Sequence, residues 1–304
     1  MSAVPQERLA WEERLAGLEE RTQPRLAEAL RGLAQNKLAL VGSVIALLFI
    51  LCAIVGPFFA PYPYDQQSLS EARLGPLAEG HVLGTDQLGR DVLSRLLKGI
   101  QISVGVGFGT TAIALVVGTV FGLISGYYRG RVDTVMNGFV EMVWGFPLIL
   151  IAILIVGALG PGLKGVILAV GFVNWAGFAR IVRGEVLVLR EKEFVQGAKA
   201  LGKSDGAILF RHLLPNVMPA ALVMGSYYIA VAVIVEAGLS FIGIGAQPPL
   251  PSLGQMVSDG RDLLLQNHWI STIPGITIVA VVLGLNLLGD GLRDILDPRL
   301  RRER

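Results

Sequence analysis

Residues 193–216 read EFVQGAKALGKSDGAILFRHLLPN and form a polar, basic island between two long apolar runs. The run before the island covers about 165–183, and the run after it covers about 217–244. A helix needs about 20 mostly apolar residues to cross a bilayer, and both runs meet that length. This alternation predicts an all-α polytopic membrane protein with a helix-forming, charged loop at the membrane surface.

The composition of the whole chain agrees with a membrane location. Of 304 residues, 53% are hydrophobic and 16% are charged, whereas soluble domains carry about 25% charged residues. The single cysteine, Cys52, lies in an apolar run and excludes a disulfide framework or a cysteine metal cluster. His81, His212 and His268 fall in three separate segments. We therefore expect no metal site.

Six stretches are long and apolar enough to span the membrane. They are about 38–60, 100–126, 137–158, 165–183, 217–244 and 270–289. The expected organisation is an N-terminal arm with an interfacial helix (1–37), a first span (38–60), an extracytoplasmic loop (61–99), a core of five spans (100–292) that contains a cytoplasmic loop (184–215), and a basic tail (293–304).

The distribution of positive charge predicts the orientation. If the N-terminus is cytoplasmic, the cytoplasmic segments 1–37, 127–134, 180–215 and 293–304 hold 20 of the 26 Lys and Arg residues, and the extracytoplasmic segments hold 6. Cytoplasmic loops carry the excess of basic residues in membrane proteins. Both termini and the 184–215 loop are therefore expected in the cytoplasm.

The second span carries glycines at four-residue spacing, namely Gly118, Gly122 and Gly126. On a helix these positions share one face and let a neighbouring backbone approach closely. The pattern predicts tight packing within one bundle, and contact with a second membrane subunit is the alternative.

The polar island also matches a phosphate-binding loop, with Gly197, four residues, and then Gly202-Lys203-Ser204. Such a loop joins a buried strand to a helix, so that backbone N–H groups surround the phosphates. Here the preceding residues continue a helical pattern from a membrane span, and 198–201 are good helix formers. We interpret the match as chance.

A docking loop for another protein explains more of the island. One short helix is expected to end near Gly202, and Ser204-Asp205 can cap a second helix over 207–213. A surface of small residues would let the first helix enter a groove of a partner. The residues expected to take part are Glu193, Gln196, Gly197, Ala198, Lys199, Gly202, Lys203, Arg211, His212 and Pro215. A solvated connector is the plainer alternative.

The spacing within the island resembles the cytoplasmic coupling motif of ABC importer permeases. Gln196-Gly197-Ala198 is followed after three residues by Gly202, and nine residues later by His212-Leu213-Leu214-Pro215. Gln196, Gly197 and His212 depart from the general consensus of that motif. The stretches that resemble the C-type permease of dipeptide, oligopeptide and nickel importers in particular are 81–97, 127–130, 236–243 and 289–298.

This resemblance implies a type I ABC importer transmembrane-domain fold and a subunit that is not an enzyme. The implied partners are a paralogous B-type permease in a heterodimer, two ABC ATPase subunits, an extracytoplasmic solute-binding protein and the lipid bilayer, with no nucleic acid. No cofactor is expected on this chain, since ATP and Mg would be used by the ATPase subunits. Dipeptides or oligopeptides are the implied substrates, and nickel or another small solute is the alternative.

Two further sets of polar residues have open roles. Glu236 is acidic within an apolar span, and with Ser240 it could line the substrate pathway or satisfy a polar group of the bundle. Asp86, Arg90 and Asp91 could contact a binding protein or stabilise a turn and the helix that Asp91 opens. The structural alternative predicts an Asp91–Arg95 pair at i,i+4.

A different class of protein would use the same acidic residues for proton coupling. An autonomous secondary transporter could handle protons with Glu236 and Asp290, and should have discontinuous helices in matched halves of the chain. The sequence offers no convincing internal repeat of that kind. A membrane enzyme is the third class, and no catalytic set supports it.

Overall fold

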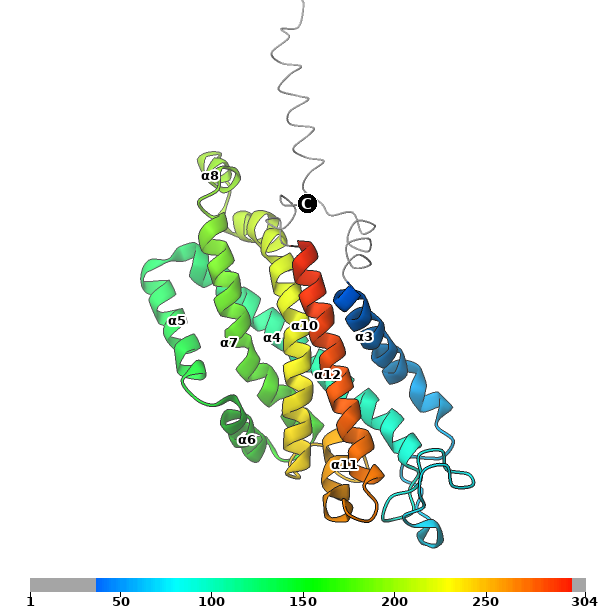
Figure 1. The fold of residues 1–304 in the computed structure, drawn as a ribbon. Helices are drawn as coiled ribbons and strands as arrows, with labels where there is room; N and C mark the ends of the chain where they lie inside the picture. Colours follow the sequence, from blue (N-terminus) through cyan, green and yellow to red (C-terminus); the bar gives the residue numbers. More distant parts are fainter. Residues whose placement is uncertain (1–36, 297–304) are drawn as a thin grey trace, which may run out of the picture.

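The computed structural model describes residues 37–296, which form a bundle of long, roughly aligned helices (Figure 1). The predicted N-terminal arm and most of the basic tail therefore lie outside the described residues. The helices of more than one turn are α3 (Lys37–Val55), α4 (Val92–Tyr128), α5 (Gly130–Trp144), α6 (Leu148–Leu159), α7 (Leu163–Leu189), α8 (Glu193–Ala200), α10 (Leu214–Phe241), α11 (Leu253–Gly260) and α12 (Trp269–Leu296). Shorter turns are η1 (Gly56–Phe59), η2 (Leu69–Glu71), α9 (Asp205–Ala207), η3 (Ile208–Leu213) and η4 (Arg261–Leu263).

Five helical segments among the described residues are long and apolar enough to cross a membrane, and a sixth span results if α5 and α6 count as one. The two helices of that pair are bent by 89° where they meet. The expectation of one continuous helix over 137–158 is therefore wrong. Pro147 lies at the break and disfavours helical backbone at Phe146, so α5 ends at Trp144.

The glycine face of α4 packs against α7. A Cβ atom at Gly118 would lie 2.4 Å from the Trp175 carbonyl oxygen, and one at Gly122 would lie 2.6 Å from the Ala179 carbonyl oxygen. No larger residue fits at these distances, so the glycines set the closeness of the two helices. The prediction of tight packing within one bundle is confirmed.

Helix α4 begins at Val92, well before the apolar run from which the second span was predicted. Asp91 is its N-cap and accepts hydrogen bonds from the Ser94 backbone N–H and hydroxyl, both at 2.7 Å. The predicted Asp91–Arg95 pair is wrong. Arg95 instead lies 3.4 Å from Asp86 and 3.6 Å from Asp259, because its side chain turns toward α11 and not along α4.

The two ends of the bundle carry different kinds of structure (Figure 1). Helix α8 and the turns after it project at one end, and the loop that precedes α4 lies with α11 at the other. Apolar side chains of α3, α4, α10, α11 and α12 form one buried cluster, and those of α4, α6, α7 and α10 form another. The predicted coupling loop (193–214) and the predicted extracytoplasmic cluster are thus separated by the length of the bundle.

Candidate functional site

Helix α8 ends in a tight turn at Gly202, as the sequence analysis expected. Gly202 has a φ of +70°, which favours glycine. Its N–H donates to the Lys199 carbonyl at 2.9 Å, and the Lys203 N–H donates to the Ala198 carbonyl at 3.1 Å. This pair of hydrogen bonds is the Schellman arrangement of a helix C-terminus. Gly197 lies inside α8, so the phosphate-loop pattern is helical and does not form an anion-binding loop.

One face of α8 packs into the bundle. Val195 is fully buried and Ala198 is 5% exposed, in an apolar cluster with side chains of α4, α7, η3 and α10. The expected role of Ala198 in an outward surface of small residues is therefore wrong. The Ala198 methyl group lies on the inner face of α8 and packs against the bundle of the same chain.

The opposite face of α8 is open. A Cβ atom at Gly197 or at Gly202 would meet no atom within 4 Å. Three large apolar side chains lie exposed in the same region, Phe194 at 44%, Leu201 at 81% and Phe210 at 63%. Exposed apolar side chains of this size around small residues are typical of a surface that another protein covers. The sequence analysis did not identify Phe194, Leu201 and Phe210 as contact residues. The available signal was that all three are large apolar residues within a charged loop.

Tyr127, at the end of α4, fastens this region to the bundle. Its hydroxyl donates to Asp205 Oδ1 at 2.6 Å, and the Lys199 Nζ lies 4.9 Å from the centre of its ring. The Tyr127 carbonyl accepts a hydrogen bond from the Arg190 guanidinium. The sequence analysis noted residues 127–130 as a motif but gave Tyr127 no role in the loop.

Several predicted contact residues form bonds within the chain. The Gln196 side-chain amide donates to the Arg190 carbonyl at 2.8 Å, and Lys203 Nζ lies 3.2 Å from His212 Nε2. Glu193, Arg211 and Pro215 are exposed. The structure thus brings all ten predicted residues to one end of the molecule, with Ala198 and Lys199 turned inward.

The segment after Gly202 connects directly to a membrane helix. The Ser204 hydroxyl accepts a hydrogen bond from the Ala207 N–H at 3.4 Å and caps α9. From Asp205 the chain stays helical through a π-helical turn, η3, into α10. The predicted second short helix is therefore continuous with the fifth span, and a displacement of α9 would move α10 with it.

The predicted binding-protein contacts are buried at the other end of the bundle. Asp86, Arg90 and Asp91 are each less than a tenth exposed. Arg90 Nε donates to Asp86 Oδ2 at 2.6 Å, and His81 Nδ1 lies 2.9 Å from Asp91 Oδ1. These bonds stabilise the loop before α4. Contact between the surface of this loop and a binding protein stays a prediction.

Asp259 of α11 joins this cluster. Its carboxylate lies 3.5 Å from the Arg90 guanidinium and 3.6 Å from that of Arg95. Burial raises the pKa of Asp259, while Arg95 and Arg90 act in the opposite direction. The cluster thereby joins the start of α4 to α11.

Glu236 and Ser240 lie inside the bundle. Glu236 is fully buried in α10 and accepts hydrogen bonds from Ser103 of α4 and from Ser240, both at 2.7 Å. The Ser240 hydroxyl also accepts from the Ala246 N–H at 3.1 Å. Within this chain the two residues connect α4 to α10, and neither lines the cavity described below.

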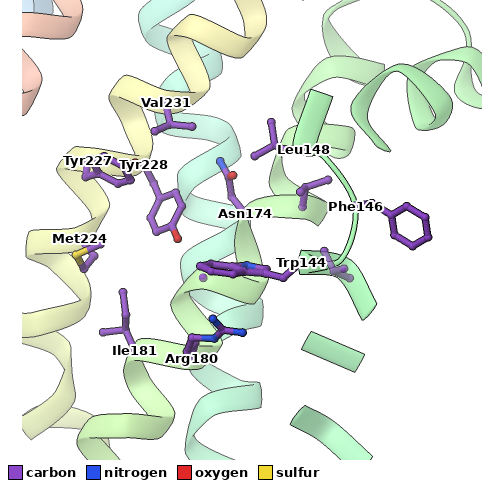
Figure 2. Close-up of a pocket in the computed structure, with 13 residues that line it drawn as sticks. Trp144, Phe146, Leu148, Asn174, Arg180, Ile181, Met224, Tyr227, Tyr228 and Val231 are labelled. Atoms are coloured by element: carbon purple, nitrogen blue, oxygen red, sulfur yellow. The ribbon is translucent and has the colours of Figure 1, made fainter. Parts of the chain in front are cut away.

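A cavity of about 540 Å³ lies between α7, α10 and the break that joins α5 to α6. Figure 2 shows Trp144, Asn174 and Tyr228 around the same space, with Arg180 beside the Trp144 ring. The sequence analysis did not find these residues. No signal marked them as a group, because the bend at Pro147 brings them together.

Comparison with known proteins places this fold and sequence among membrane transport components. The family described as binding-protein-dependent transport system inner membrane component matches residues 118–302, and the N-terminal TM domain of oligopeptide transport permease C matches residues 25–76. Both matches are to parts of transport permeases.

Curated relatives match along most of the chain. A dipeptide transport system permease protein DppC of Alkalihalophilus pseudofirmus is 42% identical and covers 90% of each chain. A glutathione transport system permease protein GsiD of Pectobacterium atrosepticum is 41% identical, over 85% of this chain and 87% of that protein. An oligopeptide transport system permease protein OppC of Bacillus subtilis is 39% identical and covers 90% of each.

Solved structures share the fold. A chain of the MetNI methionine ABC transporter in an inward-facing conformation has a TM-score of 0.55 and 18% identity, over 66% of this chain and 96% of that one. The likeness confirms the predicted type I ABC importer transmembrane-domain fold.

Proposed function

This chain belongs to the family of binding-protein-dependent transport system inner membrane components, and from that premise we propose that it is the C-type permease subunit of an ATP-driven peptide importer. It would form the translocation pathway together with a paralogous B-type permease. Two ABC ATPase subunits would bind at the α8 end, and a solute-binding protein would deliver substrate at the α11 end.

The packing of α8 supports a role in coupling ATP hydrolysis to transport. One face of this helix contacts the bundle, and the other face is open. Val195 and Ala198 hold the inner face, while Gly197 leaves the outer face free for a partner. The continuous helical path from Asp205 into α10 would transmit a displacement of this surface to a membrane helix. Alternating access could then proceed by largely rigid-body motion.

The chemistry of transport would be divided between subunits. This chain would carry no reaction of its own, and ATP and Mg²⁺ would be used by the ATPase subunits. The α8 end would face the cytoplasm, as the excess of basic residues there favours. Both termini would lie on that side of a prokaryotic inner membrane.

Peptides are the substrate class that the relatives favour. The three relatives compared above carry the names of dipeptide, oligopeptide and glutathione transport systems. We therefore propose dipeptides or oligopeptides as the cargo. Nickel or another small solute is the alternative within the same function.

Co-purification of the four membrane and ATPase subunits tests the coupling role. Gly197→Trp places a large ring on the open face of α8 without a clash inside this chain, so it should insert normally and lose the ATPase subunits. Gly197→Ala is the matched control and should keep them, because a methyl group also meets nothing within 4 Å. Retention of the ATPase subunits by Gly197→Trp would refute docking at α8.

A further inference from the structure

The cavity between α7, α10 and the α5–α6 break has the chemistry of a peptide-binding site. We propose that it is a transit site in which Asn174 pairs with a backbone amide of the substrate and Arg180 pairs with its terminal carboxylate. This inference rests on the proposed function and names contacts that the imported peptide would make; Figure 2 shows the residues that line the cavity.

The buried side-chain amide of Asn174 is unpaired in the part of the chain that the structure describes. Its side chain is 2% exposed, and neither Oδ1 nor Nδ2 has a hydrogen-bond partner among the described residues, although it lines the cavity. Buried amides are normally bonded, because an unpaired buried donor or acceptor is costly. A carboxamide offers one acceptor and one donor side by side, which complements the N–H and C=O of a peptide group.

Tyr228 and Gly177 form the wall next to Asn174. The Tyr228 ring lies on α7 at Gly177, where a Cβ atom would overlap its hydroxyl oxygen. Gly177 follows Asn174 by three residues, so both lie on neighbouring turns of one helix face. The close approach of Tyr228 therefore shapes the cavity beside the unpaired amide.

The guanidinium of Arg180 stacks on Trp144 at the edge of the same cavity. Its guanidinium carbon lies 4.1 Å from the centre of the Trp144 ring, and it forms no ion pair with a carboxylate of residues 37–293. Arg180 is an exposed residue of α7, a helix long and apolar enough to span a membrane, and a cation at such a position without an ion pair points to a function. Stacking on Trp144 holds the guanidinium plane and leaves its N–H groups free to bind a carboxylate.

The spacing of the two groups fits a short peptide. Arg180 follows Asn174 by six positions, a rise of about 9 Å along α7. An extended peptide covers about 3.3–3.6 Å per residue, so about two to three residues span that distance. The cavity volume of about 540 Å³ also lies within the range of about 300–1,000 Å³ that small-molecule sites occupy.

The other residues that line the cavity would accept peptides with different side chains. They also disfavour the binding of metal cations. Apolar and aromatic side chains such as Trp144, Leu148, Met224 and Tyr228 form most of the wall, and no Asp or Glu lines the cavity. A free nickel ion would meet no carboxylate here and would be repelled by Arg180. A zwitterionic or anionic peptide would instead be bound through its backbone and carboxylate.

Photo-crosslinking in the complete importer tests this site. The probe is a tripeptide with a photoreactive central side chain, delivered by the binding protein to the reconstituted complex. In the wild type we expect saturable crosslinks to residues 143–148 and 224–231. Arg180→Gln and Asn174→Leu should each lower the crosslink yield about tenfold, the loss expected from one hydrogen bond of the charged or fully buried kind.

A second probe separates the carboxylate contact from a general defect. The same tripeptide with a C-terminal amide should crosslink to the wild type about as weakly as the free acid crosslinks to Arg180→Gln, and should lose nothing further in that variant. Lys164→Gln removes an exposed cation of the same helix outside the cavity and should crosslink like the wild type. Co-purification of each variant with the ATPase subunits establishes that it folds.

Two results would overturn the transit site. One is a crosslink yield in both variants equal to that of the wild type, and the other is crosslinks that map away from α5, α6, α7 and α10. Failure of the proposed function is recognised separately, because the wild-type chain would then neither co-purify with ATPase subunits nor support ATP-dependent uptake.

Discussion

The Tyr127 hydroxyl donates a hydrogen bond to Asp205 Oδ1 across 2.6 Å and joins the end of α4 to the start of the helical path into α10. The two residues are 78 positions apart in the sequence. Tyr127 is 6% exposed and packs in the apolar cluster below α8. One side chain therefore supports both the inner face of α8 and the segment that leads into the membrane.

Removal of this hydroxyl should loosen the coupling segment without removing it. In Tyr127→Phe the ring and its packing remain, while a hydrogen bond to a carboxylate worth about 1.5–3 kcal/mol is lost. We expect faster hydrogen–deuterium exchange across 193–214 and weaker stimulation of ATP hydrolysis by the loaded binding protein. Tyr64→Phe is the control, because the Tyr64 hydroxyl has no hydrogen-bond partner in the described part of the chain. Equal exchange in both variants would contradict the role of Tyr127.

The closeness of α4 and α7 should make Gly118 intolerant of a single methyl group. In Gly118→Ala the new Cβ would lie 2.4 Å from a backbone oxygen of α7, so the helices must separate at a cost of about 1–3 kcal/mol. Gly105→Ala, on the same helix with nothing within 4 Å, should gain about 0.5–1 kcal/mol from reduced backbone freedom. Thermal unfolding in detergent measures both, and a shift of the same sign would argue against close packing at Gly118.

Asp91 should act as a structural residue of the loop before α4. Asp91→Ala removes a helix cap worth about 1 kcal/mol and leaves the buried His81 ring without its partner, a further loss of about 1–3 kcal/mol. We expect a clearly lower melting temperature. Asp262→Ala, at an exposed pair with Arg261, should change stability by less than about 0.5 kcal/mol. A normal melting temperature in Asp91→Ala with lost stimulation by the binding protein would instead favour direct contact.

Glu236 distinguishes a structural carboxylate from a proton carrier. In Glu236→Gln one of the two serines, Ser103 or Ser240, keeps an oxygen acceptor, and the hydroxyl of the other can accept from the amide NH2, so we expect ATP-dependent uptake to continue. Glu236→Ala leaves both hydroxyls without this partner and opens a cavity, and should lower stability by about 2–4 kcal/mol.

Transport by Glu236→Gln also bears on the alternative that the protein is a proton-coupled secondary transporter. A proton-coupled carrier that uses Glu236 would lose transport in Glu236→Gln, since the amide cannot take up and release a proton. It would also transport peptide into vesicles that contain this chain alone under a pH gradient. Uptake by this chain alone would overturn the proposal of an ATP-driven importer.

The sequence by itself determined the membrane class, five of the six spans as long helices, the polar loop between the fourth and fifth, and the Gly202 turn. These features depend on local properties, namely hydropathy over about 20 residues, helix capping and the positive φ that glycine adopts. The sequence also identified the glycine face of α4, because residues at four-residue spacing share a helix face whatever surrounds them.

The tertiary structure decided which side chains face inward and which distant residues meet. Ala198 points into the core, Glu236 bonds to Ser103 across 133 positions, and Arg95 turns to Asp259 instead of Asp91. The bend at Pro147 brings Trp144 beside α7 and completes the cavity around Asn174. Such contacts depend on the rotation and spacing of packed helices, which hydropathy, charge and residue spacing along one chain do not specify.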